Sequence, residues 1–195
     1  MWDARYAATE SLWSFEPNRF LVRETEALAP GRALDLAGGE GRNALWLAAR
    51  GWRVTVADFS AVALDRGRAR AERDGLTVEW LQADVLRWAP PERGFDLVAI
   101  LYLHLREAEL RPVLRQAADA VAPAGTLLVV AHDATNLTDG HGGPQDPDLL
   151  YTPADVTAAI EGLEVVRAER VARPVSTPAG ERTAIDALVR AVRPA

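Results

Sequence analysis

The period of apolar side chains changes repeatedly along the chain, which predicts alternating strands and helices. Five short apolar runs are typical of strands, at residues 33–37, 53–57, 77–81, 95–101 and 125–131. Three stretches between them carry apolar side chains at helical spacing, at residues 43–50, 60–74 and 106–121. The nearly continuous apolar run at 95–101 is typical of a central strand buried on both faces. This alternation predicts a parallel sheet with helices on both faces.

The last part of the chain breaks the alternation. A helix begins at Thr152 and Pro153, because threonine caps helices well and proline suits the first turn. Residues 163–171 and 184–192 then predict two strands without a helix between them, so these strands must be antiparallel. The sequence therefore predicts a Rossmann-like α/β fold, with a doubly wound, seven-stranded, mostly parallel sheet and an antiparallel edge hairpin.

The length of 195 residues fits a single domain over residues 1–195. Two segments lie outside the alternation of strands and helices. Residues 1–28 are predicted to form an N-terminal cap, and the long loop at 132–151 is predicted to lie on the substrate side. Ligands of open α/β sheets bind at the carboxyl ends of the strands, where both segments could close over one.

Composition and charge narrow the function classes. The net charge is −6 and no run of Lys or Arg forms a basic stripe, which argues against a nucleic-acid partner. The longest apolar run, residues 97–103, is too short to cross a membrane, and the first residues lack the apolar core of a signal peptide. The chain has no cysteine, so it forms neither disulfides nor thiolate metal sites. We expect a cytoplasmic protein with a small-molecule partner.

Acidic residues and a glycine turn mark the predicted carboxyl edge of the sheet. The first predicted strand runs from Asp35 into a glycine-rich turn, whose residues are Ala37, Gly38, Gly39 and Gly41. Glycines allow the backbone to turn sharply and to approach a ligand closely. Asp58 ends the second strand, where a carboxylate can accept hydrogen bonds from both ribose hydroxyls. Asp84 follows the third strand, where it could accept from an adenine amino group. Together these residues predict a nucleoside site.

This set resembles the class I S-adenosylmethionine (SAM)-dependent methyltransferases over roughly residues 30–130. The first motif of that family, Asp-x-Gly-x-Gly-x-Gly, has alanine at its first glycine position here, and Ala37 fits without strain if its φ stays negative. The resemblance implies that SAM is the cofactor. The residues that it implies for cofactor binding are Asp35, Ala37, Gly38, Gly39, Gly41, Asp58, Phe59, Asp84, Val85 and Leu101. Residues 41–48 also look like those of the small bacterial tellurite-resistance and thiopurine-type methyltransferases.

Other functions remain open at this point. Gly39, Gly41 and Ala44 also satisfy the dinucleotide fingerprint Gly-x-Gly-x-x-Gly/Ala, with Asp58 near the expected distance, so an NAD(P)-dependent oxidoreductase is one alternative. Asp35, Asp84 and the lack of room for a second domain favour SAM. A non-catalytic SAM-binding domain is another alternative, and a turn that binds no ligand is a third.

In a methyltransferase the cofactor carries the reactivity, and a general base is needed only if the nucleophile arrives protonated. The candidate catalytic residues follow the fourth and fifth strands, and they are Tyr102, His104, His132 and Asp133. A structural or surface role is an equal reading for both histidines. The candidate substrate residues are Trp2, Tyr6, Trp13 and Asn136, although the N-terminal aromatic residues could instead pack this segment onto the domain.

We predict no metal site, since the spacing of the three histidines matches no known ligand pattern. An exposed edge strand or the aromatic N-terminus would support a homodimer.

Overall fold

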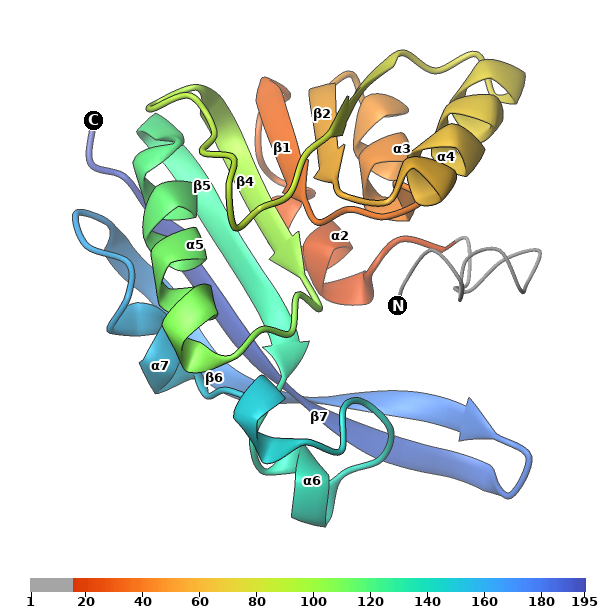
Figure 1. The fold of residues 1–195 in the computed structure, drawn as a ribbon, viewed down its shortest axis with the longest axis vertical. Coiled ribbons are helices and arrows are strands. Elements are labelled where there is room, and N and C mark those ends of the chain that lie inside the picture. The colour runs from red at the N-terminus through yellow and green to blue at the C-terminus, as the bar shows by residue number, and fades with distance from the viewer. Residues whose placement is uncertain (1–15) are drawn as a thin grey trace.

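The computed structural model describes residues 16–195 and shows one seven-stranded sheet in the order β3-β2-β1-β4-β5-β7-β6 (Figure 1). The strands are β1 (Arg32–Leu36), β2 (Arg53–Asp58), β3 (Val78–Gln82), β4 (Phe95–Leu101), β5 (Val121–His132), β6 (Glu164–Thr177) and β7 (Gly180–Val192). Strands β1 to β5 pair in parallel, whereas β7 is antiparallel to both β5 and β6. The predicted fold class is confirmed, including the antiparallel edge hairpin.

Helices cover both faces of the sheet, as Figure 1 shows. They are α2 (Arg19–Thr25), α3 (Arg42–Ala48), α4 (Ala61–Arg73), α5 (Glu107–Asp119), α6 (Asn136–Asp139) and α7 (Pro153–Thr157), with a 3-10 turn at Pro147–Leu149. Alternate residues of β1 point to opposite faces, so Ala33 packs in the core with α2, α3 and α4, and Leu34 packs in the core with α5 and α7. Within the described residues, every helix is too short or too polar to span a lipid bilayer.

Helix caps follow the predicted local chemistry. The Ser60 side chain accepts a hydrogen bond from the Ala63 amide at the start of α4. Thr152 and Asp155 form a reciprocal capping box at the start of α7, with proline in its first turn. The loop at 132–151 is not irregular throughout, because it contains α6 and the 3-10 turn.

The edge hairpin is longer than the sequence predicted. Pairing between β5 and β7 ends at His132 and Asp186, whereas pairing between β6 and β7 continues to Thr177 and Gly180. The two strands therefore extend beyond the sheet as a ribbon (Figure 1). The two predicted strands left out residues 172–183, which are polar and contain Pro174. The structure places Pro174 in β6 at the edge of the sheet, where a proline is tolerated.

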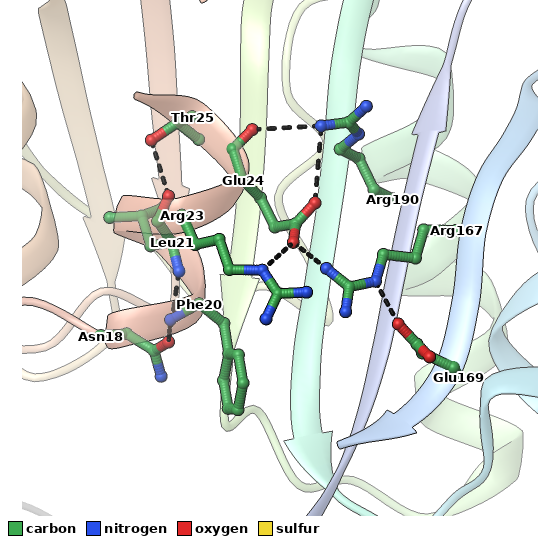
Figure 2. Close-up of polar contacts among 9 residues, drawn as sticks. All are labelled: Asn18, Phe20, Leu21, Arg23, Glu24, Thr25, Arg167, Glu169 and Arg190. Atoms are coloured by element: carbon green, nitrogen blue, oxygen red, sulfur yellow. Dashed lines mark hydrogen bonds and ion pairs between the residues drawn. The ribbon is translucent and has the colours of Figure 1, made fainter. Parts of the chain in front are cut away.

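The buried carboxylate of Glu24 connects α2 to this hairpin by ion pairs (Figure 2). Glu24 pairs with Arg190 at 3.4 Å, with Arg23 at 3.5 Å and with Arg167. Arg167 and Arg190 are register partners on β6 and β7, and like charges that face each other across strands repel. The Glu24 carboxylate offsets this repulsion and connects the N-terminal helix to both strands.

Candidate active site

The glycine turn after β1 uses left-handed backbone at three positions. The φ values are 58° at Ala37, 58° at Gly39 and 71° at Gly41. Ala37 was expected to fit without strain only if its φ were negative. Its φ is positive, so alanine is strained at this position. The Ala37 amide nevertheless donates a 2.7 Å hydrogen bond to the Ala57 carbonyl, which ties the turn to the end of β2.

Trp80 explains why glycine is required at the end of this turn. A Cβ added to Gly41 would lie 2.5 Å from the Trp80 ring, and one added to Gly67 on α4 would lie 2.3 Å from it. The indole of β3 therefore fills the space that these two glycines leave open. This packing fixes the position of the turn relative to β3 and α4.

Asp35 is a buried carboxylate beneath the turn. Its side chain is 1% exposed, and neither oxygen has a hydrogen-bond partner of normal geometry. Burial raises the pKa of the Asp35 carboxyl to about 7; nearby Arg42 lowers this pKa, Asp58 raises it, and the Ala44 backbone amide lowers it. A Cβ on Gly38 would lie 2.8 Å from the Asp35 carboxyl carbon, so only glycine leaves room above the acid. The site thus holds a buried acid with a pKa near neutrality, and a positive charge brought next to it would favour its ionised form.

The Asp58 carboxylate accepts hydrogen bonds from the backbone of the glycine turn and of the loop before α4. One carboxylate oxygen accepts a 2.9 Å hydrogen bond from the Gly39 amide, and the other accepts one from the Ser60 amide. A carboxylate oxygen has two lone pairs and can accept more than one hydrogen bond, which is the chemistry that binding of ribose hydroxyls requires. Phe59 beside it is 45% exposed, as a ring that stacks on a flat ligand would have to be.

The residues predicted for the adenine side of the cofactor lie after β3 and at the end of β4. Asp84 is exposed and accepts a 3.0 Å hydrogen bond from the Leu86 amide, while Val85 is buried. Leu101 is half-buried at the end of β4. The structure thus brings the glycine turn, Asp58 and Asp84 to one edge of the sheet, where their roles in cofactor binding remain predictions.

A second polar cluster lies at the carboxyl ends of β4 and β5. The Tyr102 hydroxyl donates a 2.9 Å hydrogen bond to Asp186, and the Arg173 guanidinium donates a 2.7 Å hydrogen bond to the same carboxylate oxygen. Nδ1 of His132 lies 3.3 Å from the other Asp186 oxygen. The rings of His104 and His132 stack with centroids 5.5 Å apart. Three of the four predicted catalytic residues therefore meet around Asp186.

The environment of His104 defines its tautomer. Its Nδ1 lies 2.9 Å from the Leu149 carbonyl, which accepts only, so Nδ1 carries the proton and Nε2 does not. Nε2 is buried without a hydrogen-bond partner, and burial lowers the pKa of His104. Tyr151 packs beside this ring and donates to the Leu103 carbonyl at 2.9 Å. The loop before α7 therefore holds His104 in place.

Two other predicted residues have different surroundings. Asp133 is fully buried and accepts hydrogen bonds from Thr135 and from Arg170 at 2.9 Å. Asn136 accepts a 2.7 Å hydrogen bond from the Ile185 amide and donates to the Gly142 carbonyl. The structure does not place either side chain against the histidines; both connect the loop after β5 to the hairpin. Trp2, Tyr6 and Trp13 lie outside the described residues.

Asp186 and Arg173 are the residues that sequence reasoning missed. Asp186 stands in the apolar run 184–189, and a charged residue within a buried strand is a signal that could have been noticed. Its partners could not have been named, because they depend on the register that places Asp186 opposite His132. Arg173 lies in the part of β6 that the predicted strands left out.

A glycine turn with acids at the ends of three parallel strands defines a nucleoside-binding α/β domain, and comparisons with known proteins agree. Residues 33–125 match the family model of a methyltransferase domain. The chain is 39% identical to the demethylmenaquinone methyltransferase of Thermus thermophilus over 104 residues, which are 52% of this chain and 47% of that protein. The chain spans about half the length of the curated relatives that it matches.

Solved structures show the same fold. TehB from Haemophilus influenzae has a TM-score of 0.75 at 17% identity, over 97% of this chain and 65% of TehB, so this likeness concerns the fold alone. The SAM-dependent methyltransferase SibL has a TM-score of 0.70 at 26% identity, over 99% of this chain and 62% of SibL. These comparisons confirm the resemblance to the class I SAM-dependent methyltransferases. This resemblance favours SAM over the dinucleotide alternative.

Proposed function

We propose that this protein transfers a methyl group from SAM to a small-molecule acceptor at the carboxyl ends of β4 and β5. The observation that carries the proposal is Asp35, a buried carboxylate without a hydrogen-bond partner of normal geometry, directly beneath the glycine turn. Such a group favours a ligand that brings positive charge. SAM carries an ammonium and a sulfonium, whereas the pyrophosphate of NAD would bring negative charge to the same carboxylate.

The residues present fit SAM. Asp58 would accept from the ribose hydroxyls, the exposed Phe59 ring would stack against the adenine, and Asp84 lies at the end of the next strand to accept from the amino group. Bound SAM would supply an activated methyl group as a good electrophile. The chain's own residues then have to orient the acceptor and exclude water, and that positioning supplies much of the rate enhancement.

The acceptor class follows from the second cluster. The second cluster is small, and it contains neutral donors and acceptors together with one ion pair, between Arg173 and Asp186. The net charge of −6 argues against a nucleic-acid acceptor. The relative from Thermus thermophilus is a demethylmenaquinone methyltransferase by name, and an aromatic acceptor is accordingly one member of the class to be screened.

Calorimetry tests the cofactor directly. Purified protein is titrated in parallel with SAM, S-adenosylhomocysteine and NAD. We expect micromolar binding of SAM or its demethylated product and none of NAD. Asp58→Ala should weaken SAM at least 10-fold, since a charge-assisted hydrogen bond contributes about 1.5–3 kcal/mol. Asp65→Ala removes an exposed carboxylate on α4 and should leave the affinity unchanged.

The outcomes separate the alternatives. Binding of NAD alone would contradict the methyltransferase proposal. Equal affinity of Asp58→Ala and wild type would place SAM elsewhere. A non-catalytic SAM-binding domain predicts that SAM binds but that no methyl group leaves it with any acceptor, so tritium transfer from methyl-labelled SAM decides between sensor and enzyme.

A further inference from the structure

Asp186 is the centre of the acceptor-side cluster. It is fully buried on β7, yet its two oxygens face Tyr102, Arg173 and His132 from three other strands or their ends. Arg173 compensates its charge, and Tyr102 holds one oxygen by a direct hydrogen bond. The second oxygen is the one that faces the imidazole of His132, its register partner on β5.

This arrangement selects one tautomer of His132. A carboxylate accepts hydrogen bonds only, so the nitrogen that faces it is the one that carries the proton. That nitrogen is Nδ1, 3.3 Å from Asp186 Oδ1, at ion-pair distance but without the alignment of a hydrogen bond. Contacts of this kind are often long before substrate binds and tighten afterwards. Nε2 of His132 is thereby left with its lone pair free.

We propose that His132 is the general base of this enzyme, that Asp186 is the residue that positions it, and that the acceptor carries a proton on its nucleophilic atom. The inference rests on the proposed methyl transfer. It assigns an acceptor class, hydroxyls, phenols and thiols, in preference to halides or other anions that need no base. It also gives the positioning role to Asp186, the register partner of His132, and not to Asp133, which follows His132 in the sequence.

A lone pair of the acceptor's oxygen or sulfur forms the new bond to the methyl carbon while the carbon–sulfur bond of SAM breaks, and the bonding pair stays on the departing sulfur. The acceptor's proton moves to Nε2 of His132, and the Asp186 carboxylate stabilises the imidazolium through Nδ1–H. The proton then leaves to solvent, so the products are S-adenosylhomocysteine, the methylated acceptor and a proton.

The groups around His132 keep it neutral and therefore able to accept that proton. Burial lowers the pKa of His132 to about 4, Asp186 raises it, and His104 and Arg173 lower it. A weak base is sufficient here, because the acceptor's oxygen or sulfur gains positive charge as the new bond forms and its proton thereby becomes strongly acidic. Tyr102 is no substitute, because burial and the Asp186 charge raise its pKa and its hydroxyl already donates to Asp186.

His104 is less suited to be the base. Its free Nε2 is fully buried within the protein, whereas 13% of the His132 side chain is exposed. His104 packs on the His132 ring and limits its rotation.

Nitrogen NMR of the histidines tests the positioning without any acceptor. The sequence contains only His104, His132 and His141, so a chain labelled with ¹⁵N-histidine gives three resolvable rings. We expect His132 in the Nδ1–H tautomer at pH 7. Asp186→Asn should shift it toward the Nε2–H form, since an amide can donate to Nδ1. Asp133→Asn, which alters a buried carboxylate bonded to Arg170, should leave the His132 tautomer unchanged.

The wild-type spectrum alone can overturn the proposal. An Nε2–H tautomer of His132 contradicts it, as does a tautomer that Asp186→Asn leaves unaltered. Should Asp186→Asn not fold, the wild-type tautomer followed between pH 3 and 8 still decides, because the proposal requires Nδ1–H throughout the neutral range.

Turnover with methyl-labelled SAM tests the acceptor class. The probes are 3,4-dihydroxybenzoate, 2-mercaptoethanol, whose thiol is protonated at neutral pH, and iodide. We expect methylation of the phenol or the thiol and a loss of about 100-fold or more in His132→Ala, with the SAM affinity unchanged by calorimetry. Methylation of iodide alone, or of none of the three while SAM is bound, contradicts the acceptor class. Loss of SAM binding in the wild type would instead contradict the proposed function itself.

Discussion

The strained residue in the cofactor turn is Ala37, whose φ of 58° suits glycine better. The left-handed conformation costs a residue with a Cβ about 1–2 kcal/mol. Ala37→Gly should therefore raise the free energy of unfolding by about 0.5–1 kcal/mol, after the greater entropy of glycine in the unfolded chain is subtracted. Urea denaturation measures it. Ala49→Gly, at φ −61° on the cap of α3, should lower stability, and a gain at both positions would contradict the strain argument.

Asp35 makes stability depend on pH. Its pKa is about 7 in the fold and 3.8 for the free side chain, so the fold favours the protonated acid. The stabilisation that this provides is complete below pH 4 and is lost as the pH rises through 7. Asp35→Asn should thus be more stable than wild type at pH 8, by up to about 4 kcal/mol, and nearly equal at pH 4. Urea denaturation at both pH values checks this; a difference that does not vary with pH would contradict it.

Among the elements, α2 depends on the Glu24 carboxylate that joins it to β6 and β7 (Figure 2). Glu24→Gln leaves Arg167 and Arg190 facing each other without compensation. We expect a loss of about 2 kcal/mol, less than for a fully buried pair, because these arginines are partly exposed. Hydrogen exchange should show faster exchange of the α2 amides. Glu26→Gln, at the exposed end of α2, is the matched control. Equal exchange rates of the α2 amides in the two variants would contradict the proposed role of Glu24 in holding α2 against β6 and β7.

The sequence was most informative where an element is defined locally. The strand before the glycine turn, the Ser60 cap and the Asp58 and Asp84 positions could all be predicted, because spacing within about fifty residues determines them. The length of the β6–β7 ribbon could not, since a polar edge strand with Pro174 has the composition of a loop. For the same reason Arg173 was missed.

For the molecule as a whole, the two proposed ligand sites differ in how far apart their residues lie in the sequence. The residues predicted to bind the cofactor fall between 35 and 101, within one run of strands and helices. The acceptor-side cluster joins Tyr102, His132, Arg173 and Asp186, and only the register of β5 with β7 and of β7 with β6 brings them together. A single sequence does not specify such registers, which is why Asp186 was missed as a neighbour of His132.

This division predicts how ligand binding stabilises the whole fold. SAM at 100 times its dissociation constant should add about 2.7 kcal/mol and raise the Tm by about 5–10 °C for a chain of this size. His132→Ala lies outside the cofactor site and should keep the full shift, whereas Asp58→Ala should lose most of it at the same SAM concentration. Differential scanning fluorimetry measures the Tm shift of wild type and of both variants. Equal loss of the shift in His132→Ala and Asp58→Ala would mean that the two sites act as one, and that the acceptor-side cluster also holds the cofactor.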